Sequence, residues 1–288
     1  MKLSAFTFIR NGSIFGFPFV ESIRSILPIV DEFVVNVGEG QDDTLDRIRA
    51  IGDPKIRIVE SRWNERMKAG GYVYGQQKMI AQFNCTGDWA FYLEGDEVVH
   101  EDDLQKIVEA CCAHLDDERV EALTFDYFHF YGNANSYLDS PGWYRREARI
   151  IRNSIRSHAP DGLFWHVPTE RNRVSRYPRA AHTGAAIYHY GWVRSEEAMN
   201  RKSENVQKYW NNSFTRIDYG EIDQRIIREF TGSHPAVIRG WLPKERGVFR
   251  ANPDHVLTRR EKKHWFMLRL ERLFGLELSK KHFIPVKS

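Results

Sequence analysis

The segment Trp89-Ala-Phe-Tyr-Leu-Glu-Gly-Asp-Glu-Val-Val-His100 changes from apolar to acidic within a few residues. Its first part, residues 89–93, is apolar and aromatic, which predicts a short buried strand. The strand then runs into Glu94-Gly-Asp-Glu97, where three of the four residues are carboxylates. Gly95 leaves room for a ligand to approach the backbone closely. Because ligands bind at the carboxyl ends of strands in an open α/β sheet, this segment indicates both a fold class and the place of a site.

The acidic residues of this segment have two interpretations. Carboxylate clusters suit Mg²⁺ or Mn²⁺, which proteins hold through one or two carboxylates together with substrate phosphates. Alternatively, an acidic turn simply precedes a helix, because acidic side chains favour the positive end of the helix dipole. The second interpretation fits Glu101, Asp102 and Asp103. Asp96 lies at the strand tip before that helix, and we assign it to the metal site.

The N-terminal part of the chain alternates between strand and helix patterns. Strands are predicted at residues 3–9, 32–38 and 55–60, where apolar residues form short runs. A helix over residues 16–28 separates the first two strands and stops at Pro28. A second helix begins near Leu45, after a loop rich in Gly and Asp. This β-α-β-α-β order with short connections predicts a parallel sheet flanked by helices.

The pattern continues to about residue 195 and then changes. Helices are predicted at residues 73–84 and 102–115, and strands at residues 121–131, 149–152 and 185–193. Beyond residue 195 the sequence is helical and basic, with no further strong strand. We therefore predict two parts, an α/β domain over residues 1–195 and a helical C-terminal extension over residues 196–288 that packs on it.

Composition restricts the class of protein. The chain has 288 residues, of which 42% are hydrophobic and 13% aromatic, enough for a sizeable core. The formal net charge is only +3, so we expect no nucleic-acid partner. Three cysteines, Cys85, Cys111 and Cys112, are too few and too poorly spaced for a disulfide framework or a zinc site. We find neither a signal peptide nor an apolar run long enough to span a membrane, and predict a soluble, cytoplasmic protein.

The basic segment that starts at Thr258-Arg-Arg-Glu-Lys-Lys263 opens the last predicted helix. One interpretation, which we favour, is a terminal helix that packs on the core and exposes a solvated basic face. The other is a basic amphipathic surface that contacts an anionic membrane from the cytoplasmic side.

Three stretches together resemble the family 2 glycosyltransferases. They are the end of the first strand with Arg10-Asn11, the acidic loop Asn36-Val-Gly-Glu-Gly-Gln-Asp-Asp-Thr44, and Gly87-Asp-Trp-Ala-Phe-Tyr-Leu-Glu-Gly-Asp-Glu97. The resemblance covers residues 1 to about 195, and His189-Tyr-Gly-Trp-Val-Arg194 looks like a late strand end of one bacterial branch. It implies a GT-A-like fold, a mostly parallel α/β sheet that binds a nucleotide and carries an acceptor-binding half.

The resemblance also implies roles for individual residues. Glu94-Gly-Asp96 takes the place of the metal-binding Asp-x-Asp motif, with Glu as the departure from the family pattern. Asp96 would be the main contact of a Mn²⁺ or Mg²⁺ cofactor, supported by Glu97. His189, at the end of a second apolar strand, could supply a further ligand as a neutral imidazole, or could equally be a histidine that is hydrogen-bonded at a strand end. The nucleotide-sugar donor would be held by Arg10, Asn11, Glu39, Asp42, Asp43, Gln76, Lys78, Glu94, Gly95 and Arg149.

Direct inverting transfer needs a base that takes the proton from the acceptor hydroxyl. Asp161 is our first candidate, because it lies in a turn of the predicted acceptor half, and Glu170 and Asp126 follow. Each of these carboxylates could equally form an Asx turn or a salt bridge. A sugar acceptor could stack on Trp143, Tyr144 or Trp165, which could also be packing residues.

The function implied is transfer of a sugar from a nucleotide-diphosphate sugar to a glycan or lipid-linked acceptor, in bacterial surface-polysaccharide assembly. Two alternatives remain. A sugar nucleotidyltransferase should carry a glycine-rich basic loop after the first strand, whereas Arg10-Asn-Gly-Ser-Ile-Phe-Gly16 has one basic residue. A non-catalytic nucleotide- or glycan-binding protein on the same fold would not need the Glu-Gly-Asp sequence.

Overall fold

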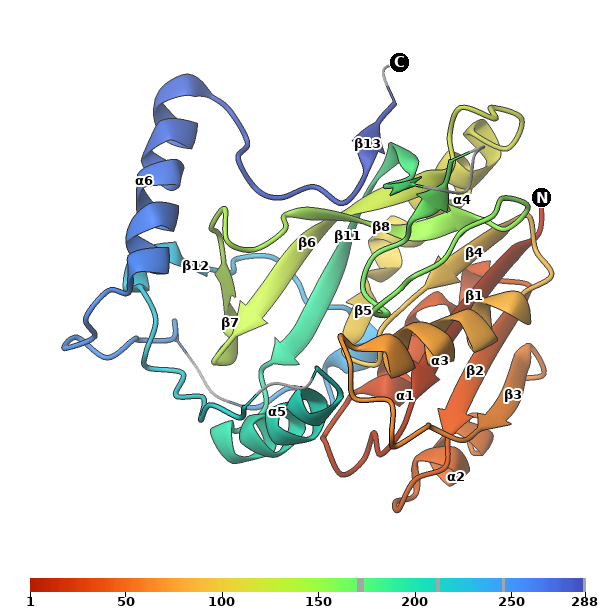
Figure 1. Ribbon diagram of the computed structural model, residues 1–288, viewed down its shortest axis with the longest axis horizontal. Helices are drawn as coiled ribbons and strands as arrows, with labels where there is room; N and C mark the ends of the chain where they lie inside the picture. Colours follow the sequence, from red (N-terminus) through yellow and green to blue (C-terminus); the bar gives the residue numbers. More distant parts are fainter. Residues whose placement is uncertain (170–173, 211–212, 245–246, 287–288) are drawn as a thin grey trace.

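A curled sheet of eleven strands forms the centre of the molecule in the computed structural model, which describes residues 1–169, 174–210, 213–244 and 247–286. Its main path runs β12-β7-β6-β8-β4-β1-β2-β3. Off this path, β11 pairs with β6, and β5 and β13 each pair with β11. Helices cover both faces of its N-terminal half (Figure 1). The strands are β1 (Leu3–Ile9), β2 (Glu32–Gly38), β3 (Ile56–Ser61), β4 (Trp89–Tyr92), β5 (Glu97–Val99), β6 (Ala122–Tyr131), β7 (Asn133–Leu138), β8 (Arg146–Arg152), β11 (Arg179–Trp192), β12 (Ile227–Glu229) and β13 (Ile284–Pro285).

The N-terminal half of the sheet is parallel, as the β-α-β-α-β pattern predicts. β1 lies between β2 and β4 and is parallel to both, so that Ala5 lies opposite Phe33 on one side and Phe91 on the other. β3 continues the parallel order beyond β2. The carboxyl ends of these strands therefore meet at one edge of the sheet, which places the acidic turns after β2 and β4 at that edge.

Alternation along the strands creates two apolar layers. Ala5 and Phe33 belong to one buried cluster and Phe6 and Val34 to the other, because successive side chains of a strand point to opposite faces. Helices α1, α2 and α4 cover the first layer, and α3 covers the second. The helices are α1 (Phe19–Ile26), α2 (Thr44–Arg49), α3 (Tyr72–Phe83), α4 (Leu104–Ala113), α5 (Glu196–Trp210) and α6 (Arg259–Phe274), with short 3₁₀ turns at Leu27–Ile29, Glu101–Asp103, Gln224–Ile226 and Ala236–Ile238.

The second half of the sheet is mixed. β8 is antiparallel to β4 and β6, whereas β11 is parallel to β6. β11 begins at Arg179, earlier than its apolar run predicts, because its first residues pair with the start of β6 and with β13. A separate antiparallel pair, β9 (Val167–Pro168) with β10 (Ser175–Arg176), precedes β11. The predicted α/β class with a mostly parallel, helix-flanked sheet is confirmed.

The segment after residue 195 is not only helical. β12 extends the sheet edge beside β7, and β13 pairs with the start of β11. Helix α5 lies at the end of the sheet to which β1 and β2 point (Figure 1), and the Tyr209 carbonyl oxygen of α5 accepts a hydrogen bond from the Gly71 amide. The division of the chain at residue 195 stays a prediction. Among the described residues, no helix combines the length and the apolar character that crossing a membrane requires.

Candidate active site

The acidic turn after β4 forms the base of the candidate site. β4 ends at Tyr92 in the middle of the sheet, and β5 starts at Glu97, so Glu94, Gly95 and Asp96 form a tight connection at the carboxyl edge. This turn lines a pocket of about 250 Å³. The other pocket-lining residues come from several elements: Phe8, Phe17, Tyr74, Tyr92, Asp161, Gly162, Leu163, Lys202, Val206 and Trp210.

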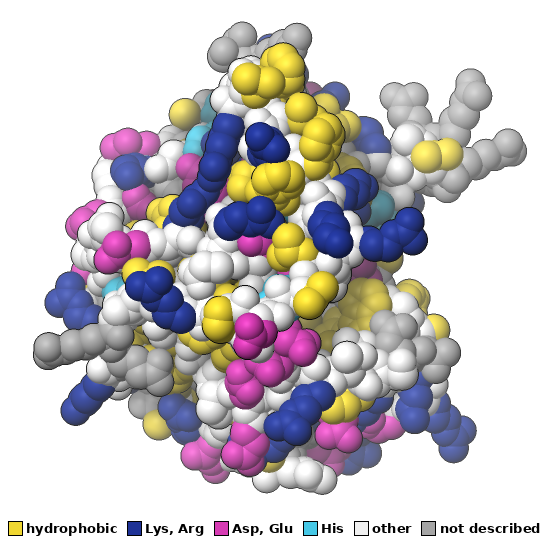
Figure 2. Space-filling model, turned by 90° about the vertical axis from the view of Figure 1, so that its left-hand side faces the viewer, with side chains coloured by type: hydrophobic (Ala, Val, Ile, Leu, Met, Phe, Trp, Pro, Cys, Tyr) yellow, Lys and Arg dark blue, Asp and Glu magenta, His cyan; other side chains and the backbone are white. Residues whose placement is uncertain are grey.

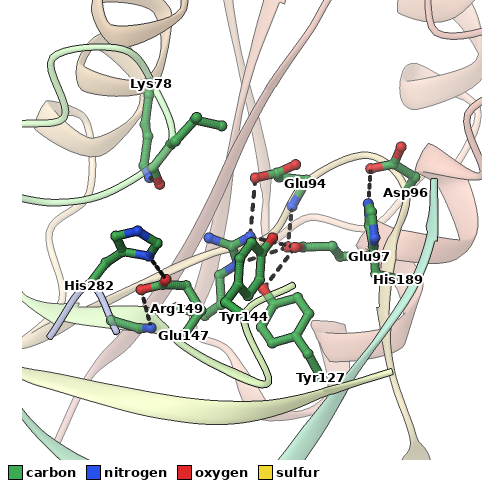
Figure 3. Close-up of polar contacts among 12 residues, drawn as sticks. Lys78, Glu94, Asp96, Glu97, Tyr127, Tyr144, Glu147, Arg149, His189 and His282 are labelled. Carbon is green, nitrogen blue, oxygen red and sulfur yellow. Dashed lines mark hydrogen bonds and ion pairs between the residues drawn. The ribbon is translucent and has the colours of Figure 1, made fainter. Parts of the chain in front are cut away.

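Asp96 is buried among positive charges. Its Oδ2 accepts hydrogen bonds from Lys202 Nζ at 2.9 Å and Arg194 Nη2 at 3.0 Å. On its other oxygen, Oδ1, it faces His189 Nε2 at 3.8 Å (Figure 3). Burial by itself would raise the pKa of Asp96, but the charges of Lys202, His189 and Arg194 outweigh it and lower that pKa. Asp96 is therefore a carboxylate that stays ionised inside the protein.

Glu94 is the second acid that faces the pocket. Its Oε1 accepts a hydrogen bond from Arg149 Nη2 at 3.1 Å. Burial and the neighbouring Glu97 carboxylate raise the pKa of Glu94 to about 7. A carboxylate oxygen of Glu94, a carboxylate oxygen of Asp96 and a ring nitrogen of His189 all lie within 4.8 Å of one another. Oxygen and imidazole ligands at this spacing suit Mn²⁺ or Mg²⁺, so these three residues could hold a divalent ion.

Glu97 has a different environment from the two pocket acids. Its side chain is fully buried and accepts hydrogen bonds from Arg149, from the Tyr127 hydroxyl at 2.8 Å and from the Glu94 amide at 3.0 Å (Figure 3). Arg149 on β8 is also buried, with its Nε 3.0 Å from Glu97 Oε2. Glu97, proposed from sequence as a supporting metal ligand, thus anchors the turn to β6 and β8.

Lys78 lies behind the pocket rather than in its lining. It projects from α3, is fully buried, and donates a hydrogen bond to the Leu163 carbonyl at 3.1 Å. Its Nζ lies 3.9 Å from the ring centre of Tyr92 and 4.1 Å from that of Trp165. Burial and the Arg149 guanidinium lower the pKa of Lys78 to about 7. Trp165 donates a hydrogen bond to Gln82 and is buried in the core, where it packs on Lys78.

A smaller cavity of about 90 Å³ adjoins the pocket and shares Phe17, Gly95 and Lys202 with it. Arg10 and Trp63 line this cavity, and the Trp63 ring lies close to Gly38. Arg10 donates to the Glu39 carbonyl at 2.7 Å and forms an ion pair with Glu65. Trp63 Nε1 is a buried donor without a hydrogen-bond partner among the described residues. This nitrogen is fully buried on the side of the ring that faces Gly38.

The acidic loop after β2 lines a separate, exposed pocket of about 480 Å³. Asp42 Oδ2 accepts a hydrogen bond from the Ile14 amide at 2.9 Å, and Asp42 Oδ1 accepts from the Thr44 hydroxyl at 2.6 Å. Asn11 adopts a left-handed backbone with φ of 55°, and its Oδ1 accepts from the Gln41 amide at 2.8 Å. The loops after β1 and β2 are therefore joined by hydrogen bonds. Glu39 lines this pocket and pairs with Arg62.

Other residues predicted from sequence lie elsewhere. Asp43 takes the N-cap position of α2 but makes no side-chain capping bond. Gln76 is exposed on α3, whereas its buried neighbour Gln77 bonds Asn36 across to β2. Trp143 packs on Trp192, and Tyr144 packs on Tyr127. These aromatic residues are outside the lining of the 250 Å³ pocket.

Among the candidate bases, Asp161 lines the same pocket as Glu94 and Asp96. Its Oδ1 accepts a hydrogen bond from the Leu163 amide at 3.0 Å, an Asx-type turn. Asp126 is mid-strand on β6 and forms ion pairs with Arg146 and His182. Glu170 lies outside the described residues.

Sequence reasoning missed Lys202 and Arg194. Arg194 stands in the motif that begins at His189, but no feature of the motif shows that its guanidinium turns back to Asp96. Lys202 lies 106 residues after Asp96, on a helix assigned to the C-terminal extension. One of three basic residues on that helix carries no local signal, and only the packing of α5 on the sheet edge identifies it.

Known proteins resemble part of this chain in sequence. Residues 18–163, about half of the chain, match the model of the family described as Glycosyl transferase family 2. Uncharacterized glycosyltransferases of Rickettsia typhi and Rickettsia prowazekii are each 23% identical to the chain over 206 residues. The match covers 69% of this chain but 64% of each relative, so the chain spans less than two thirds of their length.

Two solved structures show a partial likeness of backbone path. TarS of S. aureus (residues 1–349, in complex with UDP) has a TM-score of 0.42 at 15% identity, covering 72% of this chain and 64% of that one. Glucosyl-3-phosphoglycerate synthase from Mycobacterium tuberculosis, solved with Mn²⁺, UDP and phosphoglyceric acid, has a TM-score of 0.31 at 19% identity, covering 44% of this chain and 43% of that one.

Proposed function

The chain belongs to glycosyl transferase family 2, and from this premise we propose that it transfers a sugar from a nucleoside-diphosphate sugar to a hydroxyl of a glycan or lipid-linked acceptor. The observation that supports this function best is the pocket that the Glu94–Asp96 turn lines at the carboxyl edge of the sheet. Glu94, Asp96 and Lys202 line it, and His189 lies beside Asp96. Mostly aromatic and apolar walls with a few charged groups are typical of a small-ligand site, and these charged groups suit an anionic ligand with a cation.

The donor would extend along the sheet edge from the Asp42 pocket to the Asp96 pocket. The exposed loop with Glu39, Asp42 and Asp43 offers carboxylates to the ribose hydroxyls. Arg10 lines the smaller cavity, where polar atoms of the donor could reach it. Glu94 and Gly95 would contact the part of the donor next to the sugar. Arg149 and Lys78 would act from behind the pocket, by holding its acids and aromatic walls.

A divalent ion, Mn²⁺ or Mg²⁺, fits the donor set of Asp96, Glu94 and His189. When bound, such an ion neutralises charge that develops on a leaving diphosphate. His189 would bind it as a neutral imidazole, because burial lowers the pKa of this histidine. Asp96 stays ionised and Arg149 fixes the carboxylate of Glu94, so both acids are oriented before any ligand arrives.

Inverting transfer requires a base on the acceptor side. We propose Asp161, which lines the pocket together with Glu94 and Asp96. Asp126 is the weaker candidate, because its carboxylate is already paired with Arg146 and His182. Glu170 remains a candidate from sequence alone. A sugar acceptor would meet the aromatic wall of Tyr74 and Trp210, rather than Trp143, Tyr144 or Trp165.

We propose that helix α6 contacts the cytoplasmic surface of a membrane, and that this surface presents the acceptor in polysaccharide biosynthesis. Phe266, Leu273 and Phe274 are 58%, 74% and 63% exposed on its outer side. The two carboxylates of α6 turn inward: Glu271 binds Arg145 through two hydrogen bonds, and Glu261 caps the helix at Thr258. Hydrophobic and basic side chains are therefore neighbours on this side of the molecule (Figure 2), and the exposed basic residues of α6 are Arg259, Arg260, Lys262, Lys263, Arg269 and Arg272.

Such a surface fits an anionic bilayer. We expect the protein to co-sediment with vesicles that contain phosphatidylglycerol and not with vesicles of phosphatidylcholine alone. The double variant Phe266→Ser/Leu273→Ser should bind the anionic vesicles about thirtyfold more weakly, since each of the two exposed apolar groups contributes on the order of 1 kcal/mol. Equal binding by the variant would contradict the contact.

Donor binding tests the function itself. The purified protein is heated with each of the common nucleoside diphosphates, with and without Mn²⁺. A ligand that binds the folded state raises the melting temperature. We expect one nucleotide to do so, and more strongly with Mn²⁺. The corresponding nucleotide sugars are then incubated with the protein, and released nucleoside diphosphate is measured. Release of pyrophosphate from nucleoside triphosphate would indicate a nucleotidyltransferase, binding without turnover a non-catalytic protein, and no shift with any nucleotide would contradict the proposal.

A further inference from the structure

Two cations of the chain share one oxygen of Asp96. Lys202 Nζ and Arg194 Nη2 lie 2.9 Å and 3.0 Å from Asp96 Oδ2. The carboxylate that would bind a divalent ion is therefore already neutralised by the protein itself. A metal at Asp96 would lie next to both positive charges, and like charges at that distance repel each other. Metal binding and the position of these two side chains must be coupled.

Arg194 is held in place from several sides. Its side chain is 3% exposed, its Nη1 donates to the Phe15 carbonyl, and its guanidinium lies 4.5 Å from the ring centre of Phe17. The Tyr219 hydroxyl donates a hydrogen bond to the Arg194 carbonyl at 3.0 Å. These contacts join the loop after β1 to the end of β11. Arg194 is thus held on several sides and has little freedom to leave Asp96.

Lys202 has more freedom than Arg194. Its side chain is 20% exposed and lines both the 250 Å³ pocket and the adjoining cavity. Its Nζ lies 4.6 Å from the ring centre of Phe17 and bonds Asp96. A lysine ammonium is a point charge on a flexible stem with three donors, so it can exchange one oxygen partner for another within the pocket. The nearest new anion would be a diphosphate bound beside Glu94 and Gly95.

We propose that Lys202 is an exchangeable counter-cation: it neutralises Asp96 while the pocket holds no donor, and moves to an oxygen of the nucleoside diphosphate when the donor binds. The proposal rests on the function proposed above. Its consequence is that donor and divalent ion bind cooperatively, because the diphosphate draws Lys202 away and frees Asp96 Oδ2 for the ion. Lys202 is then a donor-binding residue as well as a barrier to metal binding without donor.

The test compares the protein with Lys202→Met, which keeps the apolar stem, and with Arg201→Gln as the control. Arg201 is the preceding residue of α5, exposed and paired with Glu197 on the same helix. Binding of Mn²⁺ alone is titrated by electron paramagnetic resonance of the free ion. We expect Lys202→Met to bind Mn²⁺ about tenfold more tightly than the unmodified protein, which corresponds to about 1.4 kcal/mol. The control should not change.

The second measurement is binding of uridine diphosphate by calorimetry, with and without Mn²⁺. Lys202→Met should bind the nucleotide about tenfold more weakly without metal, and the increase that Mn²⁺ causes should be smaller than in the unmodified protein. Lys202→Arg should restore nucleotide binding in part. Unchanged Mn²⁺ affinity in a folded Lys202→Met variant would overturn the proposal. Because that measurement needs no nucleotide, it decides the role of Lys202 even if the proposed transferase function fails.

Discussion

The turn at Asp42 and the turn at Asp96 are both acidic and both follow parallel strands of the same sheet, on either side of β1. Their surroundings differ. Asp42 lies at an exposed pocket and bonds main-chain amides and a hydroxyl from its own and the neighbouring loop. Asp96 is buried and bonds cations that lie 98 and 106 residues further along the chain. The comparison shows that one acidic sequence pattern can give a solvated loop or a preorganised charged centre, depending on which elements pack over it.

The largest expected difference between the two turns is in catalysis. Asp96→Asn removes the ionised carboxylate that faces His189, and leaves Lys202 and Arg194 without their negative partner. We expect transfer to fall by about 10³-fold, on the order of 4 kcal/mol of transition-state stabilisation. The measurement is the release of nucleoside diphosphate from the nucleotide sugar. Asp102→Asn, at an exposed acid six positions later, is the control. Full activity of Asp96→Asn would remove the turn after β4 from the active site.

Glu97 tests whether the buried turn depends on its ion pair for folding. Glu97→Gln leaves the buried Arg149 guanidinium with Glu94 as its remaining carboxylate. Breaking a buried pair from one side destabilises by about 3 kcal/mol, because a charge is left without compensation. Urea unfolding measures the change in the free energy of unfolding. Glu109→Gln, exposed on α4, should change it by less than about 0.5 kcal/mol. Equal stability of the two variants would mean that Glu97 does not anchor the turn.

A substitution in the exposed turn should weaken nucleotide binding more than it lowers the free energy of unfolding. Asp42→Ala removes a carboxylate from the proposed donor pocket, and we expect about tenfold weaker nucleotide binding, measured by calorimetry. Some stability is lost as well, about 1 kcal/mol, because the Ile14 amide and the Thr44 hydroxyl lose their acceptor. Asp46 lines the same pocket but does not make these hydrogen bonds, so Asp46→Ala is the variant for comparison. If both variants weaken binding equally, the loop acts only through its general negative charge.

The remaining difference is a pH dependence of stability that only the buried region should show. The pKa of Lys78 is lowered to about 7 by burial and by Arg149, whereas an unfolded lysine titrates near pH 10.4. Between these values the unfolded state binds more protons than the folded state, so the free energy of unfolding rises with pH. This residue contributes at most about 1.4 kcal/mol per pH unit. Lys78→Met should flatten the slope between pH 7.5 and 9 in urea unfolding. An unchanged slope, as expected for Lys262→Met on α6, would show that Lys78 keeps its ordinary titration.

The parallel half of the fold was predictable from sequence because its signals are local. Apolar runs at residues 3–9, 32–38 and 89–92 and the short loops between them specify neighbouring parallel strands. The extended start of β11 and the short strands β12 and β13 were not predictable. Their residues lack an apolar run, and they become strands because a partner strand supplies the hydrogen bonds.

The residues of the candidate site also fall into two groups, those whose place followed from local sequence and those whose place did not. Glu94, Asp96, His189 and Asp161 were all proposed from sequence, since each lies at a strand end or in a turn. Ligand atoms of the first three lie within 4.8 Å of one another, and Asp161 lines the same pocket as Glu94 and Asp96. Glu97, Lys78 and Trp165 have the right chemistry but turn away from the pocket into the protein interior. Side-chain direction at these positions depends on neighbours from β6, β8 and α3.

The sequence by itself determined the strands and helices of the parallel half and the acidic turn on which the site is built, because hydrophobic period and turn residues act over a few positions. Only the tertiary structure decided the charge state of that turn. Arg149 on β8 binds Glu94, whereas Arg194 at the end of β11 and Lys202 on α5 bind Asp96 and keep it ionised. Electrostatic interactions depend on distance and burial in the folded molecule, which no short stretch of sequence contains.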